Sequence, residues 1–277
     1  MDEEDLPFSD GASSDSISVF RKEFNKFDKY ATNYSIVSYG MRDGLINALK
    51  FDSEHAKKIH VIHNGFSQED KPPMICSHIP NKLDIAYVGD LYAGKRDATM
   101  LFKAIRGLID NGLAQSSDFL IDYAGDSCDS LYENAKPYEL QDIIYSHGRI
   151  ARKDAITMQA SADILLLLTW NTKMDRGILT GKLYEYMLIE KPIICITSGE
   201  IPQGEATETI NELALGFAGE YVSLTEDSLR LEKYLEIQLK RKLNNQKLLF
   251  EPNLKGVNEF DYDNLVIKLQ KIMGIIN

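Results

Sequence analysis

The chain has 277 residues, of which 44% are hydrophobic and 26% are charged, which suits one large domain or one domain with a substantial appendage. The formal net charge of −11 argues against nucleic-acid binding, because that binding depends on clustered Lys and Arg against phosphate. No apolar run approaches the ~20 residues of a membrane-spanning helix, and the acidic N-terminus does not look like a signal peptide. We therefore expect a soluble, cytoplasmic protein with at most peripheral membrane contact, in which a local basic pocket could bind a small phosphorylated ligand.

The cysteines and histidines indicate neither a disulfide framework nor a metal site. Cys76, Cys128 and Cys195 are odd in number, widely spaced and without a CxxC pair. The histidines are scattered along the chain and suggest no metal cluster. We expect buried or incidental thiols and no bound metal.

The N-terminal part of the sequence predicts a lead-in, a small helical region and a connector. Residues 1–16 are acidic and rich in small residues, which is typical of a disordered segment. An amphipathic helical pattern then runs to about residue 49, interrupted at 34–39 by an apolar run that could be a strand. A short strand is expected at 60–62. Residues 67–82 contain three of the eight prolines and several charges, so we interpret them as a connector between two units.

Strands and helices alternate regularly from residue 84 onward. The segment 164–168 consists of five consecutive aliphatic residues, as expected for a strand covered on both faces. Repeated strand, turn and helix predict an α/β fold with a doubly wound parallel sheet of Rossmann-like type, in which ligands bind beyond the carboxyl ends of the strands. Strands are expected at 85–88, 119–123, 142–146, 164–168, 192–196 and 220–223, and helices at 99–109, 153–161, 183–189, 228–249 and 262–275.

The loop after the first of these strands could hold an anion. Gly89 and Gly94 allow a close approach of the backbone to a ligand, and Lys95 and Arg96 lie just before the next helix, whose amide groups favour negative charge. The spacing fits GxxxxGK of a P-loop, but Arg96 stands where that motif needs Ser or Thr for magnesium, so we do not predict a triphosphatase. The alternative is an ordinary loop in which both cations are solvated.

A second candidate segment follows the aliphatic strand and opens a helix. Thr180 can cap this helix, and the free amides of Gly181, Lys182 and Leu183 would then face the same cleft. Glu185, about one turn later, could accept hydrogen bonds from ribose hydroxyls. The GxxxGK spacing is one residue short of a P-loop. The alternative is a capped helix with Glu185 on a solvated face.

Three further features give weaker signals. Trp170 ends the aliphatic strand and either packs in the core or forms a wall of the ligand pocket. His147 and Ile150 follow another strand, and His147 could serve the structure or the site equally well. The Asp-x-Asp at Asp261 and Asp263 is expected to cap the last helix rather than to bind a metal.

These segments together resemble the bacterial GT-B glycosyltransferases of the group 1, or family 4-like, type. Residues 60–66 (HVIHNGF) resemble the inter-domain linker, and residues 87–97 (YVGDLYAGKRD) resemble the opening of the donor domain. Residues 163–194 resemble the most specific segment of the family, in which Glu185 matches the acid that holds the nucleotide ribose. Residues 30–49 resemble the last strand and helix of the acceptor domain, so the resemblance covers about residues 17–270.

The resemblance implies a domain arrangement and an activity. Residues 17–66 would be a remnant of the acceptor domain with the linker, and residues 67–277 the nucleotide-sugar-binding domain, with the last helix running back over the remnant. The chain would transfer a hexose from a UDP- or GDP-sugar to a hydroxyl acceptor in polysaccharide or surface-glycan synthesis, without metal or other cofactor. Arg96 and Lys182 would stabilise the departing diphosphate. Gly89, Lys95, His147, Ile150, Trp170, Thr180, Gly181, Leu183 and Glu185 would complete the donor site.

Three departures from the family leave a second hypothesis open. Gly177 stands where many relatives have a Glu that contacts the donor sugar, and Asp90 stands where relatives often have Arg. Only about sixty residues precede the linker. The alternative is therefore a non-catalytic nucleotide-sugar-binding subunit of a split transferase, or a truncated relic, with a sugar epimerase of the same fold as a weaker third. In either case we expect a partner chain or self-association.

Overall fold

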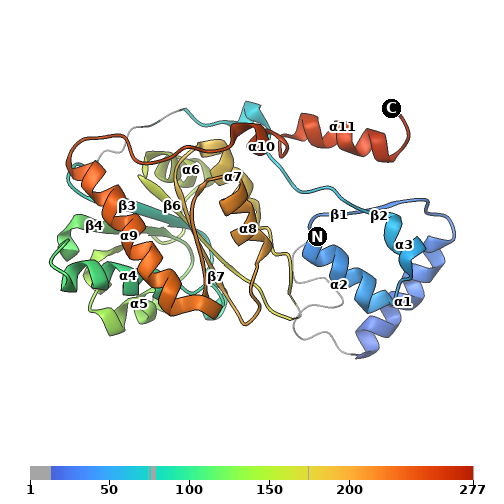
Figure 1. Cartoon of the computed structure of the whole chain (residues 1–277), viewed down its shortest axis with the longest axis horizontal. Helices are drawn as coiled ribbons and strands as arrows, with labels where there is room; N and C mark the ends of the chain where they lie inside the picture. Colours follow the sequence, from blue (N-terminus) through green and yellow to red (C-terminus); the bar gives the residue numbers. More distant parts are fainter. Residues whose placement is uncertain (1–13, 74, 76–78, 174, 277) are drawn as a thin grey trace.

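The computed structural model describes residues 14–73, 75, 79–173 and 175–276, and Figure 1 shows them as a large unit built on a sheet and a small unit beside it. Most of the expected lead-in and Cys76 lie outside the described residues. The first helix, α1 (Ser14–Asp28), begins inside the expected lead-in, so the helical region starts three residues earlier than the sequence pattern indicated.

The large unit is built on a parallel sheet, to which the described residues contribute six strands. Their order is β5-β4-β3-β6-β7-β8, and every neighbouring pair is parallel. The predicted doubly wound α/β fold is thus confirmed. The strand order reverses between β3 and β6, and in such folds the crevice at the reversal is where ligands bind. The strands are β3 (Leu83–Val88), β4 (Phe119–Ala124), β5 (Ile144–Ser146), β6 (Ile164–Trp170), β7 (Ile193–Ser198) and β8 (Gly216–Glu220).

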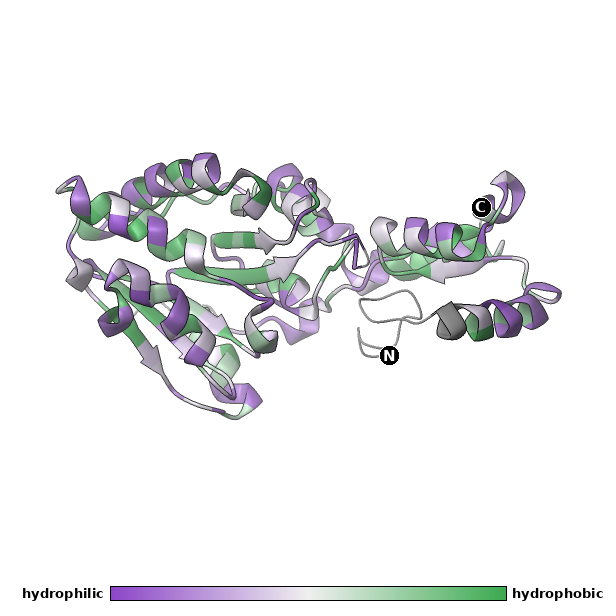
Figure 2. Cartoon of the chain, turned by 90° about the horizontal axis from the view of Figure 1, so that it is seen from below, coloured by the Kyte–Doolittle hydropathy of each residue, from purple (hydrophilic) through white to green (hydrophobic). Residues whose placement is uncertain are grey.

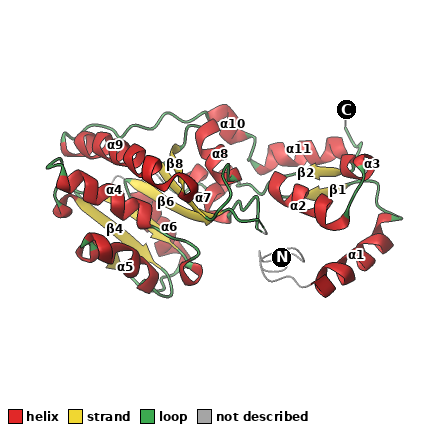
Figure 3. Ribbon diagram, turned by 60° about the horizontal axis from the view of Figure 1, so that its bottom comes forward, coloured by secondary structure: helices red, strands yellow, loops and turns green. Residues whose placement is uncertain are grey.

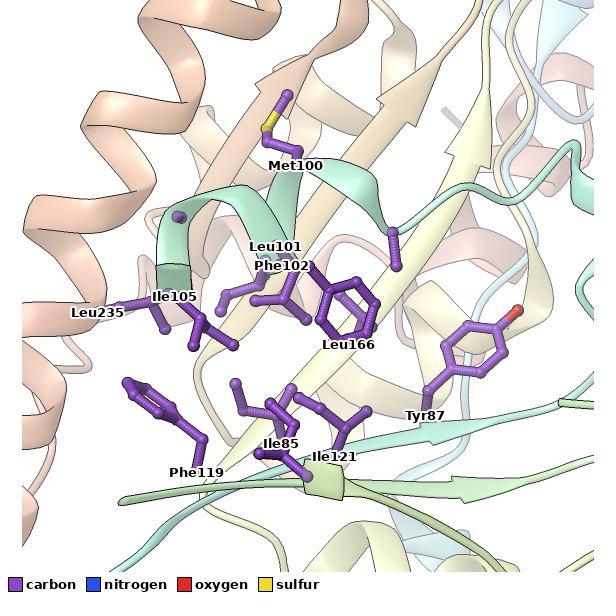
Figure 4. Packing of buried hydrophobic residues seen from close by; sticks show 14 of the residues in the cluster. Ile85, Tyr87, Met100, Leu101, Phe102, Ile105, Phe119, Ile121, Leu166 and Leu235 are labelled. Atoms are coloured by element: carbon purple, nitrogen blue, oxygen red, sulfur yellow. The ribbon is translucent and has the colours of Figure 1, made fainter. Parts of the chain in front are cut away.

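Helices cover both faces of this sheet, which explains its hydrophobic strands (Figure 2). On one face α4 (Thr99–Asp110), α5 (Asp129–Ala135) and α9 (Leu224–Leu243) enclose the main core, part of which Figure 4 shows. Helix α4 contributes fully buried residues at helical spacing, and each buried Leu or Ile contributes roughly 1.5–3 kcal/mol. On the other face lie α6 (Arg152–Ser161), α7 (Gly181–Ile189) and α8 (Glu205–Glu212).

The small unit combines the N-terminal segments with the last helix. Among the described residues, two short strands pair in parallel, β1 (Tyr34–Ile36) and β2 (Ile59–Val61). Helices α2 (Tyr39–Leu49) and α3 (Ser53–Lys57) connect them, and a small core of Leu45, Leu49 and Ile59 is packed by aromatic rings from α1. Helix α11 (Tyr262–Ile272) lies beside β2 (Figure 3), so the prediction that the last helix runs back over the N-terminal segments is confirmed.

The chain crosses between the two units twice, and the two crossings lie side by side. Phe66 and Asp261 form a parallel bridge, in which the Phe66 amide donates to the Phe260 carbonyl at 3.1 Å and the Tyr262 amide donates to the Phe66 carbonyl at 2.9 Å. The side chain of Asp261 accepts a hydrogen bond from the Asp263 amide at 2.9 Å and caps α11. The Asp-x-Asp therefore has the capping role that the sequence indicated.

Several predicted boundaries are wrong, each for a local reason. The last strand is β8, which ends at Glu220, and the expected strand at 220–223 is mostly a 3-10 helix. The glycines at both ends of the GFAG stretch have a low strand propensity, so the sequence pattern did not indicate this strand. Helix α9 ends at Leu243 instead of 249, where two asparagines follow. The sequence also missed the short helices α3, α5, α8 and α10 (Leu254–Asn258).

No helix in the described part of the chain is both long enough and apolar enough to cross a membrane.

Candidate functional site

The two glycine-containing segments meet at the reversal point of the sheet. Strand β3 leads directly into Gly89, whose φ of +125° favours glycine. A Cβ added to Gly89 would lie 2.6 Å from the Nζ of Lys182 and 2.7 Å from its Cε. Lys182 belongs to the first turn of α7, so the structure brings together residues that the sequence placed in separate loops.

The loop after Gly89 holds a left-handed stretch of backbone. Tyr92, Ala93 and Gly94 have φ angles of +47°, +49° and +90°. Two of these residues are not glycine, and such conformations persist where surrounding contacts impose them. In this stretch the ring of Tyr92 lies over the guanidinium of Arg96, with 4.2 Å between Arg96 Cζ and the ring centroid.

Arg96 is buried, which neither reading of the sequence anticipated. Its side chain donates from Nη1 to the carbonyl of Asp90 at 3.0 Å, and the residue is 3% exposed. The Nε of Arg96 is buried and has no hydrogen-bond partner within the described residues. The alternative of an ordinary loop in which both cations are solvated is therefore wrong for Arg96. In this conformation Arg96 leaves almost no surface for a direct contact with phosphate.

Lys95 and Trp170 form the rim of the same crevice. The Lys95 ammonium lies 5.5 Å from the centroid of the Trp170 ring and 3.8 Å from a carboxylate oxygen of Asp175. The Trp170 indole donates to that same oxygen at 3.3 Å. Trp170 is 7% exposed and also contacts the ring of Tyr92. The structure thus places Trp170 at the end of β6, between the two candidate loops.

The start of α7 differs from the capped helix that the sequence predicted. Thr180 occupies the N-cap position, but its side chain accepts no cap hydrogen bond, and its Oγ1 is buried with no partner in the described chain. The amide of Leu183 donates to the Thr180 carbonyl at 3.0 Å, so it is not free for a ligand, and the Leu183 side chain is fully buried. Gly181 is exposed, and a Cβ added there would meet no atom within 4 Å. The open helix start therefore consists of Gly181 and Lys182.

Glu185 is half-buried one turn further along α7. Its carboxylate makes no hydrogen bond or ion pair with any other residue that the structure describes. This leaves its oxygens available as acceptors for hydroxyl groups.

His147 and Ile150 lie in the loop after β5, at the same carboxyl edge of the sheet as Gly89, where the Gly125 amide donates to the Gly148 carbonyl at 3.1 Å. His147 follows the edge strand β5, which β4 separates from β3. Its Nε2 lies 2.9 Å from a carboxylate oxygen of Asp122, and its ring meets that of Tyr145 edge-on. These contacts orient the His147 ring, and its role in ligand binding stays a prediction. Ile150 is partly buried just before α6.

A cleft of about 340 Å³ between the two units was not predicted from the sequence. The small unit contributes the start of α2, and the large unit contributes the loop around Gly177 and the start of α8. Gly40 and Gly177 touch through their backbones, since a Cβ on Gly40 would lie 2.4 Å from the Gly177 nitrogen. The carboxylate of Glu205 accepts hydrogen bonds from the amides of Tyr39 and Gly40, both at 2.9 Å.

The cleft is polar and mainly acidic. Burial, as the largest effect, raises the pKa of Glu205, although the two backbone hydrogen bonds oppose the shift. Asp43, Glu208, Arg176 and Asn171 also line the cleft. Such groups form hydrogen bonds with hydroxyl groups of a polar ligand. No group of three or more His, Cys, Asp or Glu in the described part of the chain is arranged to hold a metal ion.

Comparison with known proteins identifies the fold. No protein-family model and no curated protein matches the sequence. The chain is similar to the structure of a glycosyltransferase from Rickettsia africae, with a TM-score of 0.63 and 18% identity over 92% of this chain and 67% of that one. It is similar to the apo form of the lipopolysaccharide outer core galactosyltransferase WaaB, with a TM-score of 0.59 and 14% identity over 96% of this chain and 66% of that one. It is also similar to the pneumococcal O-GlcNAc transferase GtfA in complex with UDP and GlcNAc, with a TM-score of 0.56 and 14% identity over 93% of this chain and 48% of that one.

The chain therefore has the fold of the GT-B glycosyltransferases, as its motifs implied. It spans 46% of the length of TarM and 71% of that of OtsA, two further structures that each match with a TM-score of 0.58.

Proposed function

We propose that this chain binds a nucleoside diphosphate-sugar, with UDP or GDP as the nucleotide, and contributes the donor side of a sugar transfer to a hydroxyl acceptor. The observation that carries the proposal is the position of Lys182. Its ammonium lies against Gly89 at the reversal point of the sheet, where the open start of α7 also faces. GtfA, which shares the fold, was solved with UDP.

Each part of the crevice has a role in this proposal. The diphosphate lies between Gly89 and the start of α7, where Lys182 and the amide of Gly181 donate to it and Lys95 adds charge at the rim. Trp170 walls the crevice, and Glu185 accepts hydrogen bonds from the ribose. The sugar extends into the polar cleft beside Gly177. His147 and Ile150, in the loop after β5 at the same edge of the sheet, complete the donor site.

The chemical role of Lys182 follows from the bond that breaks. The bond between the anomeric carbon and the diphosphate oxygen breaks, the acceptor oxygen forms a new bond to that carbon, and the acceptor proton is released. Negative charge grows on the leaving diphosphate, so a preorganised ammonium lowers the barrier. Arg96 supports the site from behind by holding the Asp90 carbonyl and the ring of Tyr92. We propose that these groups act without a metal ion.

Calorimetry with UDP and with GDP in the presence of EDTA tests the proposal. Lys182→Gln and Glu185→Ala should each weaken binding by roughly tenfold to a hundredfold, since a charged hydrogen bond is worth about 1.5–3 kcal/mol. Lys233→Gln, an exposed position on α9, is the matched control and should bind normally. The absence of binding of any nucleoside diphosphate at millimolar concentration would overturn the proposal.

A second candidate function, a non-catalytic nucleotide-sugar-binding subunit, is favoured by Gly177. No side chain can project from Gly177 into the cleft, because an added Cβ would lie 2.6 Å from the Ser38 hydroxyl and 2.7 Å from the Gly40 Cα. Transfer assays with the isolated chain separate the two functions. We expect at most slow donor hydrolysis from the isolated chain, and robust transfer to a defined acceptor would exclude the non-catalytic role.

We further propose a cytoplasmic setting in polysaccharide or surface-glycan synthesis and association with a second chain. Helix α11 exposes an apolar stripe at i, i+4, i+7 and i+11, formed by Tyr262, Val266, Leu269 and Met273. A structure with the same fold is that of the GtfA/B complex. Light scattering of the purified chain across a concentration series tests for self-association, and Val266→Lys with Leu269→Lys should abolish it.

A further inference from the structure

The small unit contains a second cavity, of about 370 Å³, between α2, β2 and α11. We call it the basic groove, because the charged residues that line it are all cationic: Arg42, Lys57, Lys268 and Lys271, with His60 among them. None of the described residues that line the groove is acidic. This is unexpected in a chain whose formal net charge is −11.

Most of the positive charge in the groove is not neutralised by the described chain. Lys57 pairs with Glu54 at 2.6 Å, and His60 Nε2 lies 2.9 Å from the side-chain oxygen of Asn33. Arg42, Lys268 and Lys271 form no ion pair with any carboxylate in the ranges that the structure describes. The Nε of Arg42 is also buried without a hydrogen-bond acceptor, and such an unmade bond costs roughly 1–3 kcal/mol.

The arrangement of the elements concentrates these cations. Lys268 and Lys271 lie three residues apart on α11, so they project from one side of the helix. Leu265, on an adjacent side, is buried and holds this part of α11 against the unit. Arg42 approaches from the first turn of α2 across the groove. Like charges held together in this way repel one another, and a bound anion would relieve the repulsion.

The geometry points to an anion-binding site for a phosphate group in this groove, in addition to the nucleotide crevice and independent of the proposed function. The three cations without a carboxylate partner carry more positive charge than one carboxylate could neutralise. A phosphate monoester or diphosphate carries about two negative charges or more and matches them better. Arg42 offers planar donors to phosphate oxygens, and the lysines add mobile charge. Tyr39 lines both this groove and the cleft between the units, so the two cavities are neighbours.

Inorganic pyrophosphate is the probe for this site, titrated into the full chain in the presence of EDTA. We expect the double variant K268Q/K271Q to weaken one class of binding site by about tenfold or more, because two charged donors are removed. Both lysines are exposed, so the variant should fold normally. The control K233Q/K255Q makes the same change of net charge at exposed lysines of α9 and α10 and should bind as the wild type does.

Two further experiments distinguish this site from the nucleotide crevice and identify the source of the phosphate. Lys182→Gln should leave the pyrophosphate binding that depends on Lys268 and Lys271 unchanged, even if no nucleotide binds to the chain. Sedimentation with phosphatidic acid vesicles, compared with phosphatidylcholine vesicles, tests a lipid headgroup. Binding to the anionic vesicles that K268Q/K271Q removes assigns a lipid source, and binding of pyrophosphate alone assigns a soluble one. Equal binding of both probes to K268Q/K271Q and to the control would overturn the inference.

Discussion

Replacing Gly89 by alanine should disable the nucleotide crevice through Lys182. The added Cβ would lie 2.6 Å from the Lys182 Nζ and 2.7 Å from its Cε, whereas ordinary contact begins at 3.4 Å. The end of the lysine side chain must therefore move by about 0.8 Å or more, the difference between 3.4 and 2.6 Å. This movement costs little because the lysine side chain is flexible. The ammonium then leaves the place where it would meet a phosphate oxygen.

The variant should lose both stability and binding, by different mechanisms. Alanine at a φ of +125° is strained, which costs roughly 1–3 kcal/mol of folding free energy. Displacement of the ammonium removes a charged hydrogen bond worth about 1.5–3 kcal/mol, so UDP should bind roughly tenfold to a hundredfold more weakly. Urea unfolding measures the first effect and calorimetry measures the second.

Gly94→Ala is the matched control within the same loop. Gly94 also has a positive φ, of +90°, but an added Cβ would meet no atom within 4 Å. It should lose similar stability and keep its affinity for UDP. In a Lys182→Gln background, Gly89→Ala should weaken binding little further, since both changes remove the same interaction. Equal losses of affinity in the two backgrounds would refute the reasoning.

The remaining predictions concern stability and the contact between the units. Burial, with smaller effects from Asp122 and Asp163, raises the pKa of Asp84 from its ordinary 3.8 to about 7. The stabilisation from the protonated carboxyl is full below pH 3.8 and is lost as the pH rises from 3.8 through 7. The free energy of unfolding of Asp84→Asn, measured in urea, should therefore rise relative to that of the wild type by up to about 3 kcal/mol between pH 5 and pH 7. A difference in free energy that does not change with pH would contradict this. Glu205→Ala leaves the amides of Tyr39 and Gly40 without their acceptor and should cost roughly 1–3 kcal/mol, with faster hydrogen exchange at those two amides, whereas Glu205→Gln retains an acceptor and should cost less. Gly177→Ala should push the two units apart, because its Cβ would lie 2.7 Å from the Gly40 Cα, and this should speed hydrogen exchange at the amides of Tyr39 and Gly40, whose acceptor is Glu205. Unchanged exchange would show that the units can absorb the methyl group.

The buried strands could be predicted because their signal is local. Five consecutive aliphatic residues in β6 indicate a strand covered on both faces, and β6 is indeed buried along its whole length. Strand β8 could not be found in the same way, since Gly216 and Gly219 lower its propensity and its pairing with β7 decides its conformation. Helices α5 and α8 were missed because both are short and begin without a side-chain cap.

In the candidate site, too, the parts with a local sequence signal were predicted and the parts formed by long-range contacts were not. Gly89 and the start of α7 were predicted because glycines and cations at helix starts form a readable pattern. The burial of Arg96 depends on the left-handed turn at Tyr92, which no sequence pattern specifies. The contact of Glu205 with the start of α2 joins residues 165 positions apart, and its carboxylate belongs to a helix that was not recognised.

The paired crossings at Phe66 and Asp261 restrict how the two units can move. A single connecting segment would act as a swivel and permit rotation in every direction. Two hydrogen-bonded segments side by side resist twisting and sliding, because either motion breaks the bonds between Phe66 and its neighbours at 3.1 and 2.9 Å. Bending about this joint would in turn have to break the hydrogen bond of 2.9 Å between the Tyr39 amide and the Glu205 carboxylate, so the described contacts tie the two units together at two places.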